Sequence, residues 1–281
     1  MKKSTLFLLT FLTLSAFGQN KLDKSKSELN SGSKKNQTNT TTTSTRGSSK
    51  SSQSNAEPLL GGVIVDVLMY ATYGIFKYGM IGDYKNENHL YSNLTPYPFY
   101  NGTSGNFEKT EDTISISKNK ARLDIENSFV YKDNTLYGNH FKAKIRPFQY
   151  FYLQTDFHQL FEFNKIDNTN NRLSLFQFNL NYDRIRLEKF NFGWNLGATY
   201  VGNEVRKAGL AYGLNAEYFM GNHISFLGAA KWSKINGLPV NAYELQSKFH
   251  RKNYFFTLGF EHLKIATPTY NFVALGAGIY F

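Results

Sequence analysis

The chain has 281 residues, with 32 lysines and arginines against 21 acidic residues, and it contains no cysteine. Without cysteine, neither disulfides nor thiolate metal sites can hold the fold together. Residues 1–57 carry nine basic and three acidic side chains, so six of the eleven net positive charges lie there. Because the basic residues form no cluster on a predicted folded face, the charge does not indicate a nucleic-acid partner.

The N-terminus has the pattern of a secretory signal peptide over residues 1–18. Lys2 and Lys3 precede a short apolar run, and small residues then lead to Gly18. The apolar run is much shorter than the ~20 residues of a membrane-spanning helix. We therefore expect cleavage between Gly18 and Gln19 and export of the protein to the cell envelope.

Residues 19–57 consist mainly of Ser, Thr, Asn, Gln and Lys, and they include no aromatic residue. Such a composition offers little apolar surface to bury, so we expect a disordered periplasmic linker. An alternative interpretation is a basic tether to acidic lipid head groups or cell-wall polymer.

Residues 58–110 form a separate region in which an apolar segment precedes an aromatic one. Within 59–81, four side chains recur at helical spacing and form one polar stripe: Asp66, Tyr70, Tyr73 and Lys77. This stripe predicts an amphipathic helix that lies in a bilayer interface or packs against the rest of the fold. The β-branched run within the same segment also permits two extra strands. Residues 82–110, rich in glycine, proline and aromatic residues, predict an irregular loop.

From about residue 113, apolar and polar side chains alternate with a period of two, which is typical of strands. Most predicted strands reach the ~9–11 residues that cross a bilayer at a tilt. Longer polar connections are expected to alternate with tight turns, as they do at the two ends of an up-and-down barrel. The ten predicted strands cover 113–131, 137–146, 149–163, 172–187, 191–201, 207–220, 223–234, 239–250, 253–264 and 269–281.

The two faces of these strands differ sharply in polarity. One face is rich in aromatic and aliphatic residues, and the other carries amides and charges. Six cations and seven carboxylates share the polar face, and such near-balance favours an interlocked, mostly closed lumen over a selective pore lined by one sign of charge. This predicted lumenal charge network comprises Arg122, Asp124, Glu126, Lys142, Lys144, Arg146, Asp156, Glu162, Glu217, Lys231, Glu244, Lys248 and Glu261.

The last predicted strand has one apolar face, small residues on the other face, and an aromatic final residue, Phe281. It resembles the closing strand of a Gram-negative outer-membrane β-barrel. The resemblance implies an all-β fold, a transmembrane antiparallel up-and-down barrel of about ten strands over 111–281, in which Ile279 and Phe281 take part in closure. It also implies outer-membrane lipids and the barrel-assembly machinery as partners, and envelope proteins as further candidates.

One strand places Asp156 and His158 on the same inward face, and another places Asp124 and Glu126 together. A histidine–carboxylate pair of suitable geometry can act as a general base. These elements resemble those of omptins, ten-stranded barrel proteases, although the connections here are shorter and the acidic pair is Asp/Glu. The histidines of the predicted strands have no convincing serine partner in the sequence, where pairing in space is not visible. The sequence contains no metal-binding or cofactor-binding motif.

The sequence therefore favours a structural or interaction role for a barrel with a mostly closed polar lumen and no enzymatic activity. A narrow porin-like pore for small solutes is the first alternative. A barrel-embedded, omptin-like hydrolase that uses Asp156 and His158 is the second.

Overall fold

The computed structural model describes residues 20–32, 69–83, 85–87, 89, 92–108, 121–148, 150–164 and 168–281. The predicted signal peptide and most of the predicted linker lie outside these residues. The chain divides into two compact units, one formed by residues 1–33 and 89–281 and the other by residues 34–88.

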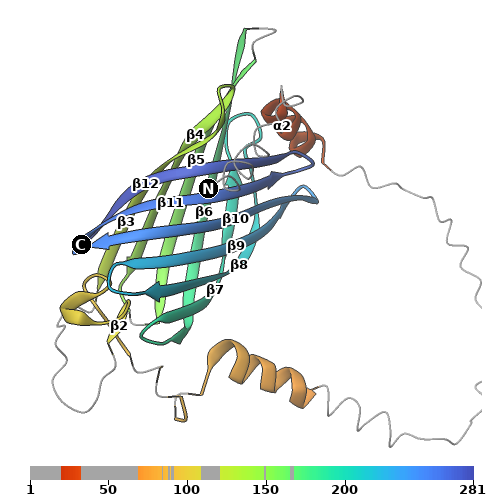
Figure 1. Ribbon diagram of the computed structural model, residues 1–281. Coiled ribbons are helices and arrows are strands. Elements are labelled where there is room, and N and C mark those ends of the chain that lie inside the picture. Colours follow the sequence, from red (N-terminus) through yellow and green to blue (C-terminus); the bar gives the residue numbers. More distant parts are fainter. Residues whose placement is uncertain are drawn as a thin grey trace, which may run out of the picture. The chain divides into compact units, whose positions relative to one another are not determined.

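The larger unit is a closed barrel of antiparallel strands, which confirms the predicted fold class (Figure 1). Each strand pairs with its neighbours in the chain, and the order β10-β11-β12-β3-β4-β5-β6-β7-β8-β9 returns to β10. The strands are Arg122–Asp133 (β3), Leu136–Arg146 (β4), Phe151–Asn164 (β5), Thr169–Arg186 (β6), Phe190–Val201 (β7), Lys207–Met220 (β8), Ile224–Ile235 (β9), Leu238–Arg251 (β10), Tyr254–Ile265 (β11) and Thr269–Tyr280 (β12).

The barrel closes where β12 pairs with β3. Ile279 lies opposite Ile125 in this ladder. One residue further on, the Phe281 N–H donates to the carbonyl of Leu123 at 2.8 Å, and the Leu123 N–H donates back to Phe281 at 3.1 Å. Each of the ten barrel strands that the structure describes is therefore paired on both sides. A sheet needs this in hydrocarbon, where no water can satisfy the backbone.

The outer face of the barrel is apolar and the inner face is mainly polar. Leu210, Leu245 and Leu275 are each at least 63% exposed, whereas charged side chains such as Glu126 and Lys142 are at most 4% exposed. Tyr182 departs from the predicted pattern, because it is buried between the rings of Phe151 and Trp194. An apolar belt of this extent is stable against lipid rather than water.

The connections at the two ends of the barrel do not alternate in length as predicted. We call the end where β3 begins and β12 ends the proximal mouth, and the opposite end the distal mouth. Distal connections have two to five residues and proximal ones two to four. The prediction failed because several apparent loop residues, such as Thr169 and Leu238, extend the strand ladders instead.

The sequence predicted a lumen that is polar along its whole length, but part of the lumen is apolar. Toward the distal mouth the inward side chains are aliphatic, and Leu160, Leu173, Val240 and Leu263 are all at most 1% exposed. These residues follow the same inward alternation as the charged ones, but apolar residues on both faces hide that alternation in the sequence. The interior therefore consists of an apolar layer toward the distal mouth and a charged layer on its proximal side.

The apolar layer is completed by a helix, Lys21–Ser31 (α2), which lies at the distal mouth (Figure 1). Its Leu22 and Leu29 are fully buried against the layer. The prediction of disorder over 19–57 is therefore wrong for these eleven residues. Two leucines seven positions apart, with Ser25 and Lys26 between them, form one helical face that only the barrel can cover.

Several polar contacts hold α2 to the barrel. The first two helical N–H groups, of Lys21 and Leu22, donate to the carboxylate of Glu162 at 2.9 and 2.8 Å. Glu162, predicted to belong to the ion-pair network, thus caps a helix N-terminus, where backbone N–H groups lack partners and favour a negative charge. Ser25 Oγ contacts the Tyr270 hydroxyl, and the Asn236 amide donates to the carbonyl of Leu29 at 2.7 Å.

Lys26 adds an ion pair to Glu204 at 2.6 Å. Burial removes part of the hydration of the Lys26 ammonium group, but the carboxylates of Glu204 and Asp23 outweigh this cost, so the pKa of Lys26 is raised above its ordinary value.

Residues 92–108 lie at the proximal mouth. They form a short hairpin, Asn93–Leu94 (β1) with Phe107–Glu108 (β2), and a 3₁₀ turn, Tyr100–Gly102 (η3). The ring of Phe99 packs on Phe219 and His250 with centroids 5.7 and 5.5 Å apart. A side chain at Gly105 would collide with the carbonyl of Glu188, so only glycine permits this close approach.

In the smaller unit, residues 69–81 are helical, and Ile75–Ile81 form a π-helical stretch (η1). Helix is therefore the conformation of this part of 59–81, and the hairpin alternative does not hold there. The Lys77 ammonium lies 5.6 Å from the ring centre of Tyr73, within the predicted polar stripe. Among the described residues, no helix is both long and apolar enough to cross a bilayer.

Candidate functional site

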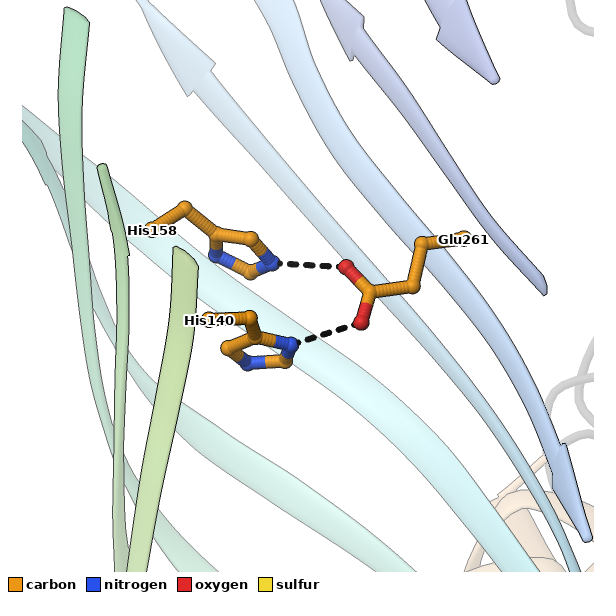
Figure 2. Close-up of side chains that lie close together, drawn as sticks. All are labelled: His140, His158 and Glu261. Atoms are coloured by element: carbon orange, nitrogen blue, oxygen red, sulfur yellow. Dashed lines mark hydrogen bonds and ion pairs between the residues drawn. The ribbon is translucent and has the colours of Figure 1, made fainter. Parts of the chain in front are cut away.

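Two histidines and a glutamate meet inside the lumen, directly below the apolar layer. His140 on β4 and His158 on β5 are cross-strand partners, and their rings stack with centroids 3.7 Å apart. Glu261 reaches them from β11, on another part of the wall. Figure 2 shows its two oxygens directed at the two rings, with His140 Nδ1 at 2.8 Å and His158 Nε2 at 3.0 Å. We call these three residues the histidine cluster.

A second carboxylate, that of Asp156, also contacts the histidine cluster. Asp156 lies two residues before His158 on β5, and its Oδ1 is 3.3 Å from His140 Nε2. The same carboxylate accepts hydrogen bonds from Gln154 and forms an ion pair with Lys231 of β9. His140 is thus held between Asp156 and Glu261, one carboxylate at each ring nitrogen.

The cluster is shielded from bulk solvent. His140, His158, Asp156 and Glu261 are each at most 3% exposed. An internal cavity borders all four side chains, and it has room for about one water molecule.

The structure separates the four side chains that the sequence proposed as a hydrolytic site. Asp156 contacts His140, while His158 contacts Glu261, so the two do not form the expected pair. Asp124 binds Arg122 at 2.6 Å, and Glu126 binds Lys248 at 2.9 Å. Within the described part of the chain, no hydrogen bond or ion pair joins Asp124 or Glu126 to Asp156 or His158.

The sequence missed the grouping of Glu261 with the two histidines. His140 lies two and four residues before Lys142 and Lys144, so it belongs to the same inward face of the strand. A tight connection between β4 and β5 then brings positions 140 and 158 opposite each other. That signal could have paired the histidines. No comparable signal relates them to Glu261, because β11 is more than a hundred residues further along the chain and meets them only across the lumen.

A serine–histidine pair, which the strand pattern did not predict, lies near the proximal mouth. Ser225 Oγ is 2.8 Å from His250 Nε2 and 2.9 Å from a Glu217 oxygen, and His250 Nδ1 is 3.2 Å from the Tyr280 hydroxyl. Ser225 is fully buried, and Phe99 packs on the imidazole. In this arrangement the hydroxyl is enclosed by protein.

Comparison with known proteins gives fold-level similarity only. No family model matches the sequence, and no curated protein matches it. Among solved structures, an outer-membrane channel from Pseudomonas putida F1 has a TM-score of 0.34 at 8% identity, covering 62% of this chain and 100% of that one. Yersinia pestis Ail in a nanodisc gives 0.33 at 14%, covering 57% and 98%. Pseudomonas aeruginosa OprG gives 0.31 at 11%, covering 58% and 96%.

The class of protein follows from the geometry described above. A closed ten-stranded antiparallel barrel with an apolar exterior and a buried polar interior is built to reside in a bilayer. The protein is an outer-membrane β-barrel protein, as the closing strand indicated.

Proposed function

We propose that this protein is a closed outer-membrane barrel with a structural or binding role, and not an open pore. The observation that carries the proposal is that side chains cross the lumen while a separate segment of the chain covers each mouth. Both features obstruct the path that a solute would follow through the barrel.

Ion pairs connect distant parts of the barrel wall. Lys142 of β4 binds Glu244 of β10, Lys231 of β9 binds Asp156 of β5, and Lys248 of β10 binds Glu126 of β3. Three internal cavities along the lumen each have room for about one water molecule. An ion that crossed the barrel would have to break these pairs, which is costly because each partner would remain buried and unpaired.

The covered mouths also supply the surfaces through which such a barrel would bind partners. At the distal mouth the exposed face of α2 and the neighbouring connections form one surface, joined by the hydrogen bond from the Thr267 N–H to Glu28. At the proximal mouth residues 92–108 form another, held by Ser92 Oγ on the carbonyl of Arg186. An interaction role for the barrel therefore involves its ends more than its lumen.

Planar-bilayer recording on the refolded full-length protein tests this proposal. We expect no steady open-channel current from the parent protein. A variant that releases α2, Leu22→Asp with Leu29→Asp, should also stay closed, because the ion pairs below it remain. Lys24→Asp, on the exposed side of α2, is the matched control.

A steady current from the parent protein would contradict the proposal and favour the narrow-pore alternative. Current that appears only after release of α2 would assign the seal to the helix and not to the charged layer. Assays of peptide cleavage with the parent protein and His158→Ala address the hydrolase alternative in the same preparations.

A further inference from the structure

We propose that His140, His158 and Glu261 bind one divalent transition-metal ion of the zinc class inside the barrel. The inference goes beyond the proposed function, because a closed barrel needs no metal, and it departs from the sequence, which predicted none. It rests on the donor set, the hydrogen-bond pattern of His140 and the charge of the surroundings.

The donor set is the one that borderline divalent metals prefer. Two imidazole nitrogens and a carboxylate are common protein ligands of zinc, with a water molecule completing four-coordination. The three potential ligand atoms lie within 4.8 Å of one another. A tetrahedral ion ~2.0–2.2 Å from each ligand holds its ligands roughly 3.4 Å apart. Small side-chain rotations therefore suffice, and the adjoining cavity has room for the water.

His140 faces a carboxylate at each ring nitrogen, Asp156 at Nε2 and Glu261 at Nδ1, the latter 2.8 Å away. A carboxylate only accepts hydrogen bonds, so each of these contacts needs a proton or a cation between the two atoms. A neutral ring carries one proton, and when that proton lies on Nε2, toward Asp156, the Nδ1 lone pair and the Glu261 oxygen can share a metal cation. A carboxylate behind a metal-ligating histidine is a recurrent arrangement around zinc.

The charges around the histidine cluster leave room for a cation. The nearest ammonium groups are already paired, Lys231 with Asp156 and Lys142 with Glu244. Glu261 has no lysine or arginine partner among the described residues and contacts only the two imidazoles. His158 Nδ1 has no hydrogen-bond partner within the described part of the chain, so a metal on Nε2 would not disturb a second contact of this ring.

The bound ion would join β4 and β5 to β11 across the lumen. It would therefore stabilise the native barrel, since a ligand that binds only the folded state shifts unfolding toward higher temperature. Because the lumen is closed, we expect the ion to enter during folding and to exchange slowly afterwards.

The test uses the full-length protein with a cleavable tag that contains no histidine. Protein is refolded with Zn²⁺ or with EDTA, freed of unbound metal by gel filtration, and analysed by elemental mass spectrometry. We expect about one zinc per chain after refolding with Zn²⁺, and a higher unfolding temperature than after refolding with EDTA. Refolding with Co²⁺ should give the intense visible absorption of a four-coordinate site.

Two variants and one control locate the site. His158→Gln should lose the bound metal and the Co²⁺ absorption. Asp156→Asn should retain binding with about 10–100-fold lower affinity, the usual effect of removing a carboxylate behind a ligating histidine. His262→Gln should bind like the parent, because His262 contacts Asn271 and not the cluster.

Absence of stoichiometric zinc and of Co²⁺ absorption in the parent protein would overturn the proposal, whether or not the variants fold. So would equal loss of metal in His262→Gln. Heat-modifiable migration on SDS gels verifies that each variant forms a barrel. The conductance of the parent protein is a separate readout, so failure of the metal site and failure of the closed-barrel proposal can be told apart.

Discussion

The distal and proximal halves of the lumen are filled in two different ways. Below α2, aliphatic side chains pack together, and burial of Leu22 and Leu29 contributes roughly 1.5–3 kcal/mol each without any polar group to satisfy. Below this layer, the lumen is filled by carboxylates and cations that are costly to bury unless each is paired. We therefore expect the apolar half to tolerate the loss of one contact better than the charged half does.

The largest expected effect is in the charged half. Glu126 accepts hydrogen bonds from Lys248 and Gln246, both at 2.9 Å, and lies near Lys142. Glu126→Leu should lower the free energy of unfolding by about 3–5 kcal/mol, because two ammonium groups lose a buried partner. Urea unfolding in lipid vesicles, followed by tryptophan fluorescence, measures this change.

Glu188→Leu, at an exposed position of the proximal mouth, provides the matched control for the loss of a glutamate. The double variant Glu126→Leu with Lys248→Met should recover part of the loss, since it removes one of the unpaired charges. A cost below about 1 kcal/mol for Glu126→Leu, as seen for exposed ion pairs, would mean that water enters the charged half.

In the apolar half the expected effect is smaller and local. Leu29→Ala should weaken the docking of α2 by about 2–4 kcal/mol, because it removes buried methyl groups and leaves a cavity. Hydrogen exchange of the amides in Lys21–Ser31 should accelerate accordingly, while exchange in β3 to β12 stays unchanged. Lys24→Ala, on the exposed face of α2, should leave both rates as they are. Faster exchange throughout the barrel would show that α2 is required for its stability and is not simply docked onto it.

The smallest expected effect concerns the cap of α2. Glu162→Gln keeps the shape of the side chain but removes the negative charge at the helix N-terminus. We expect a loss of about 1 kcal/mol in the docking of α2, measured by the same amide exchange. Glu188→Gln, at the opposite mouth, should have no effect on α2. Equal protection in parent and Glu162→Gln would mean that side-chain hydrogen bonding alone, without the charge, stabilises the helix end.

Much of the barrel could be predicted from local patterns in the sequence. A period of two places the side chains of a strand on alternate faces, so the inward positions of Glu126, Lys142 and Lys248 followed from the sequence. The partners of those charges did not follow. Lys231 meets Asp156, and Lys248 meets Glu126, only because the closed barrel brings residues more than seventy positions apart to the same depth of one lumen.

The helix α2 illustrates a different limit. Its composition is that of a disordered segment, and an isolated eleven-residue helix is marginal in water. The spacing of Leu22 and Leu29 was visible in the sequence, but its meaning depends on an apolar layer to which nine strands contribute. Local composition cannot report a surface that forms only when those strands have closed.

The strands and their alternating faces could be predicted from the sequence, because alternation is a property of a single segment. The outer-membrane location could be predicted from the pattern at the N-terminus and from the resemblance of the last strand. The layering of the lumen, the covering of its mouths and the meeting of His140, His158 and Glu261 became visible in the folded barrel. The physical reason is that burial and hydrogen bonding in a barrel are decided across the lumen, between strands whose separation in the chain bears no fixed relation to their separation in space.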